Sequence, residues 1–174
     1  MHSRIYQLST SPIPKDEYIT IEDISYAPFN FIGEIADYVD DIPETQLTSE
    51  YVGLYRDLAH ANDATPFSVN MVKLSNGAPE TLIFSEGFPQ GYFRKKYAEF
   101  REVLRKLDAV DSAQFADDHT GNVGYLIFLL RAAHNERFGT YIWIDGDLLT
   151  LDEFVRTCEL NTPYYFGNVL DYHF

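Results

Sequence analysis

The feature that most constrains the fold is a long amphipathic segment from Gly91 to Val110. Its large apolar residues recur at steps of four and three: Phe93, Tyr97, Phe100, Leu104 and Leu107. This spacing places them in one stripe along an α-helix, and no Pro or Gly interrupts the segment after Gly91. We therefore predict a helix whose apolar stripe faces a hydrophobic core.

The same segment carries six of the thirteen basic residues of the chain: Arg94, Lys95, Lys96, Arg101, Arg105 and Lys106. At 100° per residue, the three arginines fall along one flank of the apolar stripe. Two of the lysines have partners along the helix, because Lys95–Glu99 and Glu102–Lys106 are opposite charges at the i, i+4 spacing. The arginine flank has only Asp108 nearby, so its partners are expected elsewhere.

A second amphipathic helix is predicted from Phe31 to Ile42, ended by Pro43. Its polar positions are almost all acidic: Glu34, Asp37, Asp40 and Asp41. We hypothesise that the flank formed by Glu34, Asp37 and Asp41 packs beside the arginine flank within the fold, because neighbouring helices lie ~8–10 Å apart. Two alternatives stay open: both flanks are solvated and contribute little to stability, or one of them contacts a partner.

Two hairpin signals indicate antiparallel strands. Asn76-Gly77 separates strands predicted at residues 67–74 and 80–85, and Asp145-Gly146 separates strands at 140–144 and 147–149. Thr150 and Glu153 form a capping box, which predicts a short helix ending near Cys158.

The remaining elements are predicted from shorter patterns. Strands are expected at residues 4–8 and 164–174, Thr20 caps a brief helical turn with Asp23, and a helix begins near Thr48. Residues 123–133 fit either a strand or a helix, and their length favours a mostly buried helix. The order of elements predicts an α+β fold with one domain spanning residues 1–174. Its antiparallel sheet has about five strands, with helices packed on one face.

Composition limits the classes of partner. The net charge is −14, which disfavours direct binding to nucleic acid or to an anionic membrane. The single cysteine, Cys158, excludes an internal disulfide, and the N-terminus lacks the apolar core of a signal peptide. The longest apolar run, residues 123–130, is far shorter than the ~20 residues of a membrane span. We therefore expect a soluble, cytoplasmic protein.

No cofactor or metal is expected, and no catalytic motif is present. Asp117, Asp118 and His119 form one polar cluster, and Cys158 is a candidate nucleophile, but each also fits an ordinary structural role. The segment from Asp145 to Glu153 resembles part of a calcium loop but lacks its glycine and its final glutamate at the required positions.

We therefore expect a non-enzymatic interaction protein that binds a basic protein partner. A narrower form of this hypothesis is a protein that imitates nucleic acid, as some toxin-neutralising and anti-defence proteins do. The alternative is an enzyme that uses Asp117, Asp118, His119 or Cys158. The sequence leaves the oligomeric state open. The candidate partner-binding residues are Glu34, Asp37, Asp40, Asp41, Arg94, Arg101 and Arg105.

Overall fold

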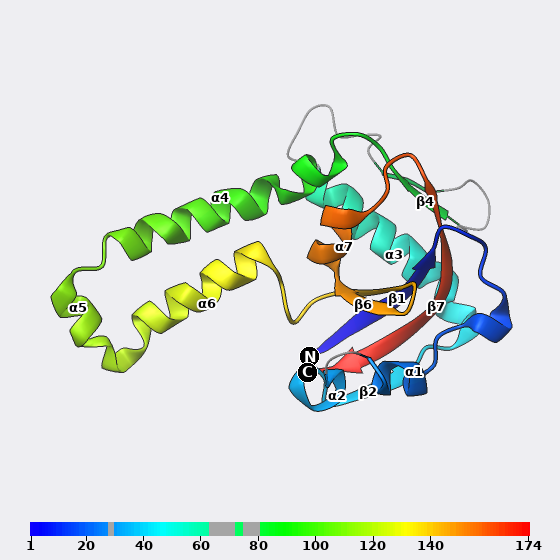
Figure 1. Cartoon of the computed structure of the whole chain (residues 1–174), viewed down its shortest axis with the longest axis horizontal. Helices are drawn as coiled ribbons and strands as arrows, with labels where there is room; N and C mark the ends of the chain where they lie inside the picture. Colours follow the sequence, from blue (N-terminus) through cyan, green and yellow to red (C-terminus); the bar gives the residue numbers. More distant parts are fainter. Residues whose placement is uncertain (28–29, 63–71, 75–80) are drawn as a thin grey trace.

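A mixed sheet forms the centre of this computed structural model, which describes residues 1–27, 30–62, 72–74 and 81–174 (Figure 1). Its strands are β1 (His2–Ser9), β2 (Tyr38–Asp41), β3 (Val72–Leu74), β4 (Thr81–Phe84), β5 (Tyr141–Ile144), β6 (Asp147–Thr150) and β7 (Pro163–His173). The order is β3-β4-β7-β1-β5-β6, and β2 pairs with the end of β7. All pairs are antiparallel except β1 with β5.

Helices cover both faces of this sheet. The helices are α1 (Ile21–Ser25), α2 (Phe31–Glu34), α3 (Glu44–Asn62), α4 (Phe88–Asp108), α5 (Ser112–Ala116), α6 (Asn122–His134) and α7 (Leu151–Thr157), with 3-10 turns η1 (Lys15–Glu17) and η2 (Asp118–Thr120). The larger core places α3, the start of α4 and α7 against one face, around fully buried Phe84, Phe88 and Phe154. A smaller core on the other face joins α1 and α2 to the sheet, around Phe31, Tyr141 and Tyr172. The α+β class is confirmed, but helices pack on both faces of the sheet rather than on one, and one strand pair is parallel.

Strand β7 is the longest strand and contacts β1, β2 and β4. Its side chains alternate between the two cores, with Phe166 and Val169 in the larger one and Leu170 and Tyr172 in the smaller one. The register between β1 and β7 shifts once, at Gln7. Because both faces of this sheet are covered, β7 is apolar along most of its length rather than on alternate residues only.

Gln7 fills the register shift with hydrogen bonds. Its side-chain oxygen accepts from the backbone N–H groups of Ile19 and Asn168, both at 3.0 Å, and its amide donates to the carbonyl of Glu17 at 2.9 Å. Gly167 lies directly against this side chain: a Cβ atom there would stand 2.7 Å from Cδ of Gln7. The buried amide therefore requires glycine at position 167.

This close approach gives a testable expectation. Gly167→Ala is expected to lower the free energy of unfolding by about 1–3 kcal/mol, because Gln7 must move and loses buried hydrogen bonds. The control is Gly53→Ala in α3, where a Cβ meets nothing within 4 Å. That change should instead stabilise the protein by about 0.5–1 kcal/mol, because glycine is unfavourable inside a helix. Urea unfolding measures both, and equal effects would contradict the role assigned to Gly167.

Most predicted elements are confirmed. The capping boxes at Thr20 and Thr150 are both formed, and the turn at Asp145-Gly146 has positive φ at both residues, 52° and 87°. The helix expected near Thr48 begins earlier, at Glu44. Strands β3 and β4 pair antiparallel as expected. The Asn76-Gly77 turn and residues 67–71 lie outside the described part of the chain.

The helix predicted from Phe31 to Ile42 is wrong. Helix α2 ends at Glu34, because Gly33 adopts a φ of 108°, and the chain then forms β2 against β7. Phe31, Ile35 and Val39 still share one core. The spacing of the apolar residues therefore predicted correctly which side chains are buried, but it did not predict the backbone conformation. Pairing with the last four residues of β7 outweighs the local helical pattern.

Candidate functional site

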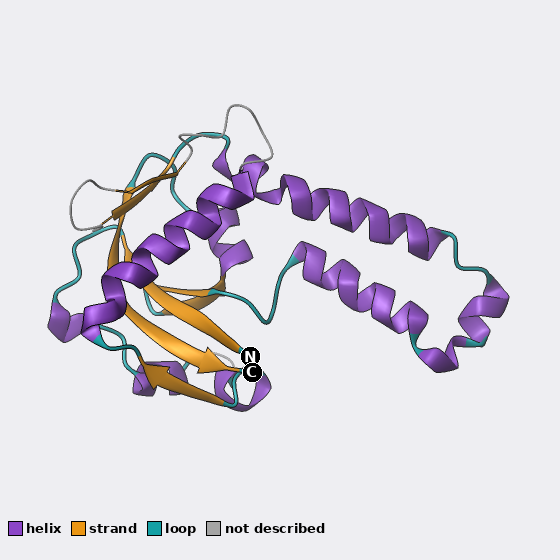
Figure 2. Ribbon diagram, turned by 180° about the vertical axis from the view of Figure 1, so that it is seen from behind, coloured by secondary structure: helices purple, strands orange, loops and turns teal. Residues whose placement is uncertain are grey.

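A helical hairpin projects from the rest of the protein (Figures 1 and 2). Helix α4 leaves the sheet, α5 and η2 form the turn, and α6 returns beside α4. We call residues 93–134 the arm and the remainder the body. The arm therefore exposes far more surface than a helix packed on the sheet would.

Local capping defines the turn of the arm. Asp111 and Gln114 form a capping box at the start of α5. The carboxylate of Asp118 then accepts from the backbone N–H groups of Val123 and Gly124, at 3.0 and 3.3 Å. A carboxylate at the N-terminus of α6 also interacts favourably with the helix dipole. Asp118 thus has a structural role at the tip.

Beyond Phe93, the apolar stripe of α4 does not face the core of the sheet, contrary to the prediction. Tyr97 is 63% exposed and Leu104 is 38% exposed, while Phe100 and Leu107 are half-buried. The residue that α4 buries within the arm is Val103, which lines a groove with Leu129 and Ala133 of α6. The prediction failed because a periodic pattern shows that an apolar stripe exists, but not what covers it.

The prediction that residues 123–133 form a helix is confirmed, but the prediction that this helix is mostly buried is wrong. Within α6, only the side chain of Val123 is buried. The exposed fractions are 61% for Tyr125, 42% for Ile127 and 54% for Phe128, and Phe115 in the turn reaches 68%. Tyr125 stacks on Phe128, and Ile127 lines a groove with Phe115, so the arm presents exposed apolar surface of the kind that marks interaction sites.

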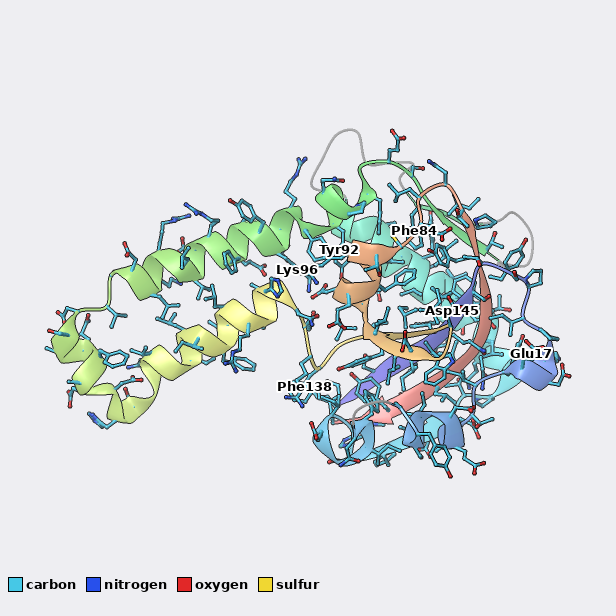
Figure 3. The ribbon with its side chains drawn as sticks, viewed as in Figure 1. Glu17, Phe84, Tyr92, Lys96, Phe138 and Asp145 are labelled. Carbon is cyan, nitrogen blue, oxygen red and sulfur yellow. The ribbon has the colours of Figure 1, made fainter. Side chains whose placement is uncertain are left out.

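A buried carboxylate joins the arm to the body. Asp152 in α7 is 1% exposed and accepts from the hydroxyl of Tyr92 at 2.9 Å and the ammonium of Lys96 at 3.0 Å, both from α4. It also accepts from the backbone N–H of Glu136, just beyond α6, at 2.8 Å. Figure 3 shows Tyr92 and Lys96 where α4 meets α7. Burial, reinforced by Asp152, raises the pKa of Tyr92, so the phenol stays protonated and donates.

Sequence reasoning did not identify this network. Asp152 stands inside the capping box of Thr150 and Glu153, where an acidic residue is expected for its effect on the helix dipole alone. The three groups that donate to Asp152 come from sites 16 to 60 residues away along the chain, so only the tertiary structure distinguishes Asp152 from an ordinary acidic residue at a helix start. The network fixes both ends of the arm to one side chain.

The two charged flanks do not meet, so the predicted contact between them is wrong. The three arginines are exposed on the arm, and Arg105 pairs with Glu102 of its own helix at 2.8 Å. Glu34 pairs instead with Arg137 at 3.3 Å, and Asp37 lies 3.1 Å from His173. The hypothesis required a second long helix beside α4, and residues 31–42 do not form one.

The four acidic candidates lie at one end of the sheet, on α2, on β2 and between them, and the side chains of Asp40 and Asp41 point to opposite sides of the sheet. Helices α1 and α2 and strand β2 contact one another at one end of the sheet (Figure 1). We define the acidic face as the exposed residues Glu22, Tyr26, Glu34, Asp37, Tyr38, Asp40 and Asp41 on these elements. Glu22, Asp40 and Asp41 form no ion pair within the described residues. Tyr26 is 80% exposed, and Tyr38, whose ring stacks on His173, is 43% exposed, so this end of the sheet also presents two large aromatic side chains.

The candidate catalytic residues do not form one site. Asp117, Asp118 and His119 lie in the exposed turn of the arm, whereas Cys158 follows α7 on the body (Figure 1). Burial raises the pKa of the Cys158 thiol to about 11, which leaves little nucleophilic thiolate at neutral pH. Across the described ranges, no three His, Cys, Asp or Glu side chains are grouped as metal ligands would be.

Comparisons with protein-family models, with curated protein sequences and with solved structures find no match to this chain. In the described part of the chain, no helix is long and apolar enough to span a membrane.

Proposed function

We propose that this protein is a non-enzymatic interaction protein whose acidic face binds a basic protein partner. The single observation that supports this proposal most strongly is the separation of charge between the arm and the body. The arm contains seven Lys and Arg residues and six Asp and Glu residues, so it is nearly neutral. The residues outside the arm include six basic and twenty-one acidic ones and therefore carry −15, against −14 for the whole chain.

The acidic face has the composition of a binding surface. Exposed tyrosines contribute large contact areas at low entropic cost, and interface residues with large energetic effects are often tyrosines. Carboxylates around them steer a basic partner and exclude acidic ones. Because Glu22, Asp40 and Asp41 have no ion pair within the described residues, they are available to pair with Lys or Arg side chains of a partner.

The net charge also bears on the kind of partner. A strongly acidic body repels phosphate backbones and anionic lipid headgroups, so we propose neither direct nucleic-acid binding nor membrane binding. The narrower proposal is that the partner is itself a nucleic-acid-binding protein and that the acidic face occupies its basic site. Under that proposal, duplex DNA and this protein compete for the same partner.

Affinity capture from cells that contain the protein tests the proposal. The wild type is expected to retain a protein of strongly basic composition, and retention should fall as sodium chloride rises from 50 to 500 mM, because salt screens charge pairs. The variant Asp40→Asn/Asp41→Asn should retain at least about tenfold less, since interface charge pairs contribute ~1 kcal/mol or more. Added duplex DNA should release the partner if the narrower proposal holds.

A matched control separates the acidic face from net charge alone. Asp145→Asn/Asp147→Asn removes the same two charges at the turn between β5 and β6, away from the acidic face. This control should retain the partner as the wild type does. Equal losses in both variants, or capture that is insensitive to salt, would contradict binding through the acidic face.

A further inference from the structure

We propose that the arm pairs with the arm of a second copy of this chain, with α4 antiparallel to α4 of the other copy. This inference rests on the exposed surface of the arm and is independent of the partner proposed for the acidic face. The two arms together would form a four-helix bundle, and the bodies would lie at its opposite ends.

The exposed stripe on α4 has the spacing of a coiled-coil seam. In heptad notation Tyr97 and Leu104 occupy a positions, and Phe100 and Leu107 occupy d positions. An apolar stripe confined to a and d is narrower than the stripe of a helix that packs on a sheet. Such a seam accepts one facing helix, and Tyr97 and Leu104 remain exposed in the single chain.

The two sides of this seam differ. The g positions, Lys96 and Val103, point toward α6 and the body: Val103 is buried, and Lys96 binds Asp152. The e positions are Arg94, Arg101 and Asp108, which are exposed and form no ion pair within the described residues. The open side of the seam is therefore bordered by charges that have no partner in the described residues.

These charges favour the antiparallel arrangement. In an antiparallel pair e positions face e positions, so Arg94 faces Asp108 of the second copy, and this attraction occurs twice. The one repulsive contact in this arrangement is between Arg101 of one copy and Arg101 of the other. In a parallel pair g faces e, which places Lys96 against Arg101 of the second copy twice, and both contacts are repulsive.

The side chains of the seam fit the same register. When Arg94 faces Asp108, the a and d layers place Tyr97 opposite Leu107 and Phe100 opposite Leu104 of the second copy. Each aromatic ring then meets a leucine, and large residues alternate with small ones as close packing requires. Beside the seam, α6 adds exposed Ile127, which lines a groove with Leu107 and extends the apolar face onto a second helix.

The body charges and the size of the face agree with this arrangement. The part of α4 that belongs to the arm, residues 93–108, is about 24 Å long, so antiparallel arms separate the acidic bodies by more than the ~8 Å Debye length at physiological salt. A face of this length and two helices wide covers on the order of 500 Å² in projection. Because side chains protrude from the helices, the accessible area of this face is larger than its projection and approaches the ~800 Å² that each partner contributes to a standard interface.

Sedimentation velocity of the full chain tests the pairing. At 20 µM and 150 mM salt the wild type is expected to sediment at twice the 20.0 kDa mass of one chain. Tyr97→Glu/Leu104→Glu should sediment as a single chain with unchanged circular dichroism, because both residues are exposed in the single chain. The expected weakening is at least about a hundredfold, since two charges enter an apolar seam.

The matched control lies one residue further along the same helix. Ala98→Glu/Arg105→Ala changes the net charge by the same two units at b positions, which point away from the seam, and should leave the dimer intact. A single-chain mass for the wild type at 100 µM would overturn the proposal. A dimer that survives Tyr97→Glu/Leu104→Glu would also overturn it.

A charge swap tests the direction of pairing. Arg94→Asp and Asp108→Arg should each weaken the dimer about tenfold, because each turns two attractive contacts into repulsive ones. The double variant Arg94→Asp/Asp108→Arg should restore the wild-type affinity. Failure of the double variant to recover would overturn the antiparallel register, because residues 94 and 108 face each other only in that arrangement.

Discussion

Asp152→Ala is expected to lower the free energy of unfolding by about 3–5 kcal/mol. The carboxylate is almost completely buried and accepts three hydrogen bonds, so its removal leaves the Tyr92 hydroxyl and the Glu136 N–H without acceptors. Lys96 retains Glu136 at 3.3 Å, which places the expected loss toward the lower end. In a chain of this length the thermal midpoint should fall by about 6–20 °C.

Thermal and urea unfolding measure this loss, with both proteins at the same concentration because association makes apparent stability depend on concentration. The control is Asp147→Ala, which removes an exposed carboxylate at the start of β6 and should change stability by less than about 0.5 kcal/mol. A loss below about 1 kcal/mol for Asp152→Ala would show that Asp152 does not hold the arm to the body as described.

Phe84→Ala is expected to cost about 3–5 kcal/mol, whereas Phe115→Ala should cost less than about 0.5 kcal/mol. Phe84 is completely buried, and its ring contacts those of Phe88, Phe154 and Tyr164 at centroid distances of 4.8 to 5.7 Å. Truncation removes this contact area and leaves a cavity. Phe115 is 68% exposed in the turn of the arm and buries little within one chain.

The two phenylalanine variants are matched in chemistry, so urea unfolding compares burial alone. Similar losses for both would mean that the arm is packed against the body in solution. That result would contradict the projecting arm of Figure 1.

Local signals predicted much of the backbone. Thr20 and Thr150 cap helices because each hydroxyl accepts from the N–H three residues later, a bond that depends only on neighbouring residues. The turn at Asp145-Gly146 is local in the same sense. Segment 31–42 was predicted wrongly because its conformation depends on β7, more than 120 residues away along the chain.

Burial was harder to predict than secondary structure. The spacing of Phe93, Tyr97 and Phe100 predicts one stripe, yet Phe93 packs beside the body core while Tyr97 is exposed on the arm. The difference arises because α4 extends past the edge of the body. The spacing of the apolar residues does not predict how far the helix extends. The acidic residues at positions 34, 37, 40 and 41 were identified from composition, but their place at one end of the sheet required the tertiary structure.

We propose that the body and the arm present different surfaces, one open to a basic partner and one covered by a second copy. Hydroxyl-radical footprinting of the purified protein at 20 µM tests it most directly, with Tyr26 on the acidic face and Tyr97 in the seam as the two reporters. Both are well exposed in a single chain, at 80% and 63%. We expect Tyr97 to be oxidised at least several-fold more slowly than Tyr26, and Tyr97→Glu/Leu104→Glu to leave the rate at Tyr26 unchanged. Oxidation of Tyr97 and Tyr26 in proportion to those two exposures would contradict it.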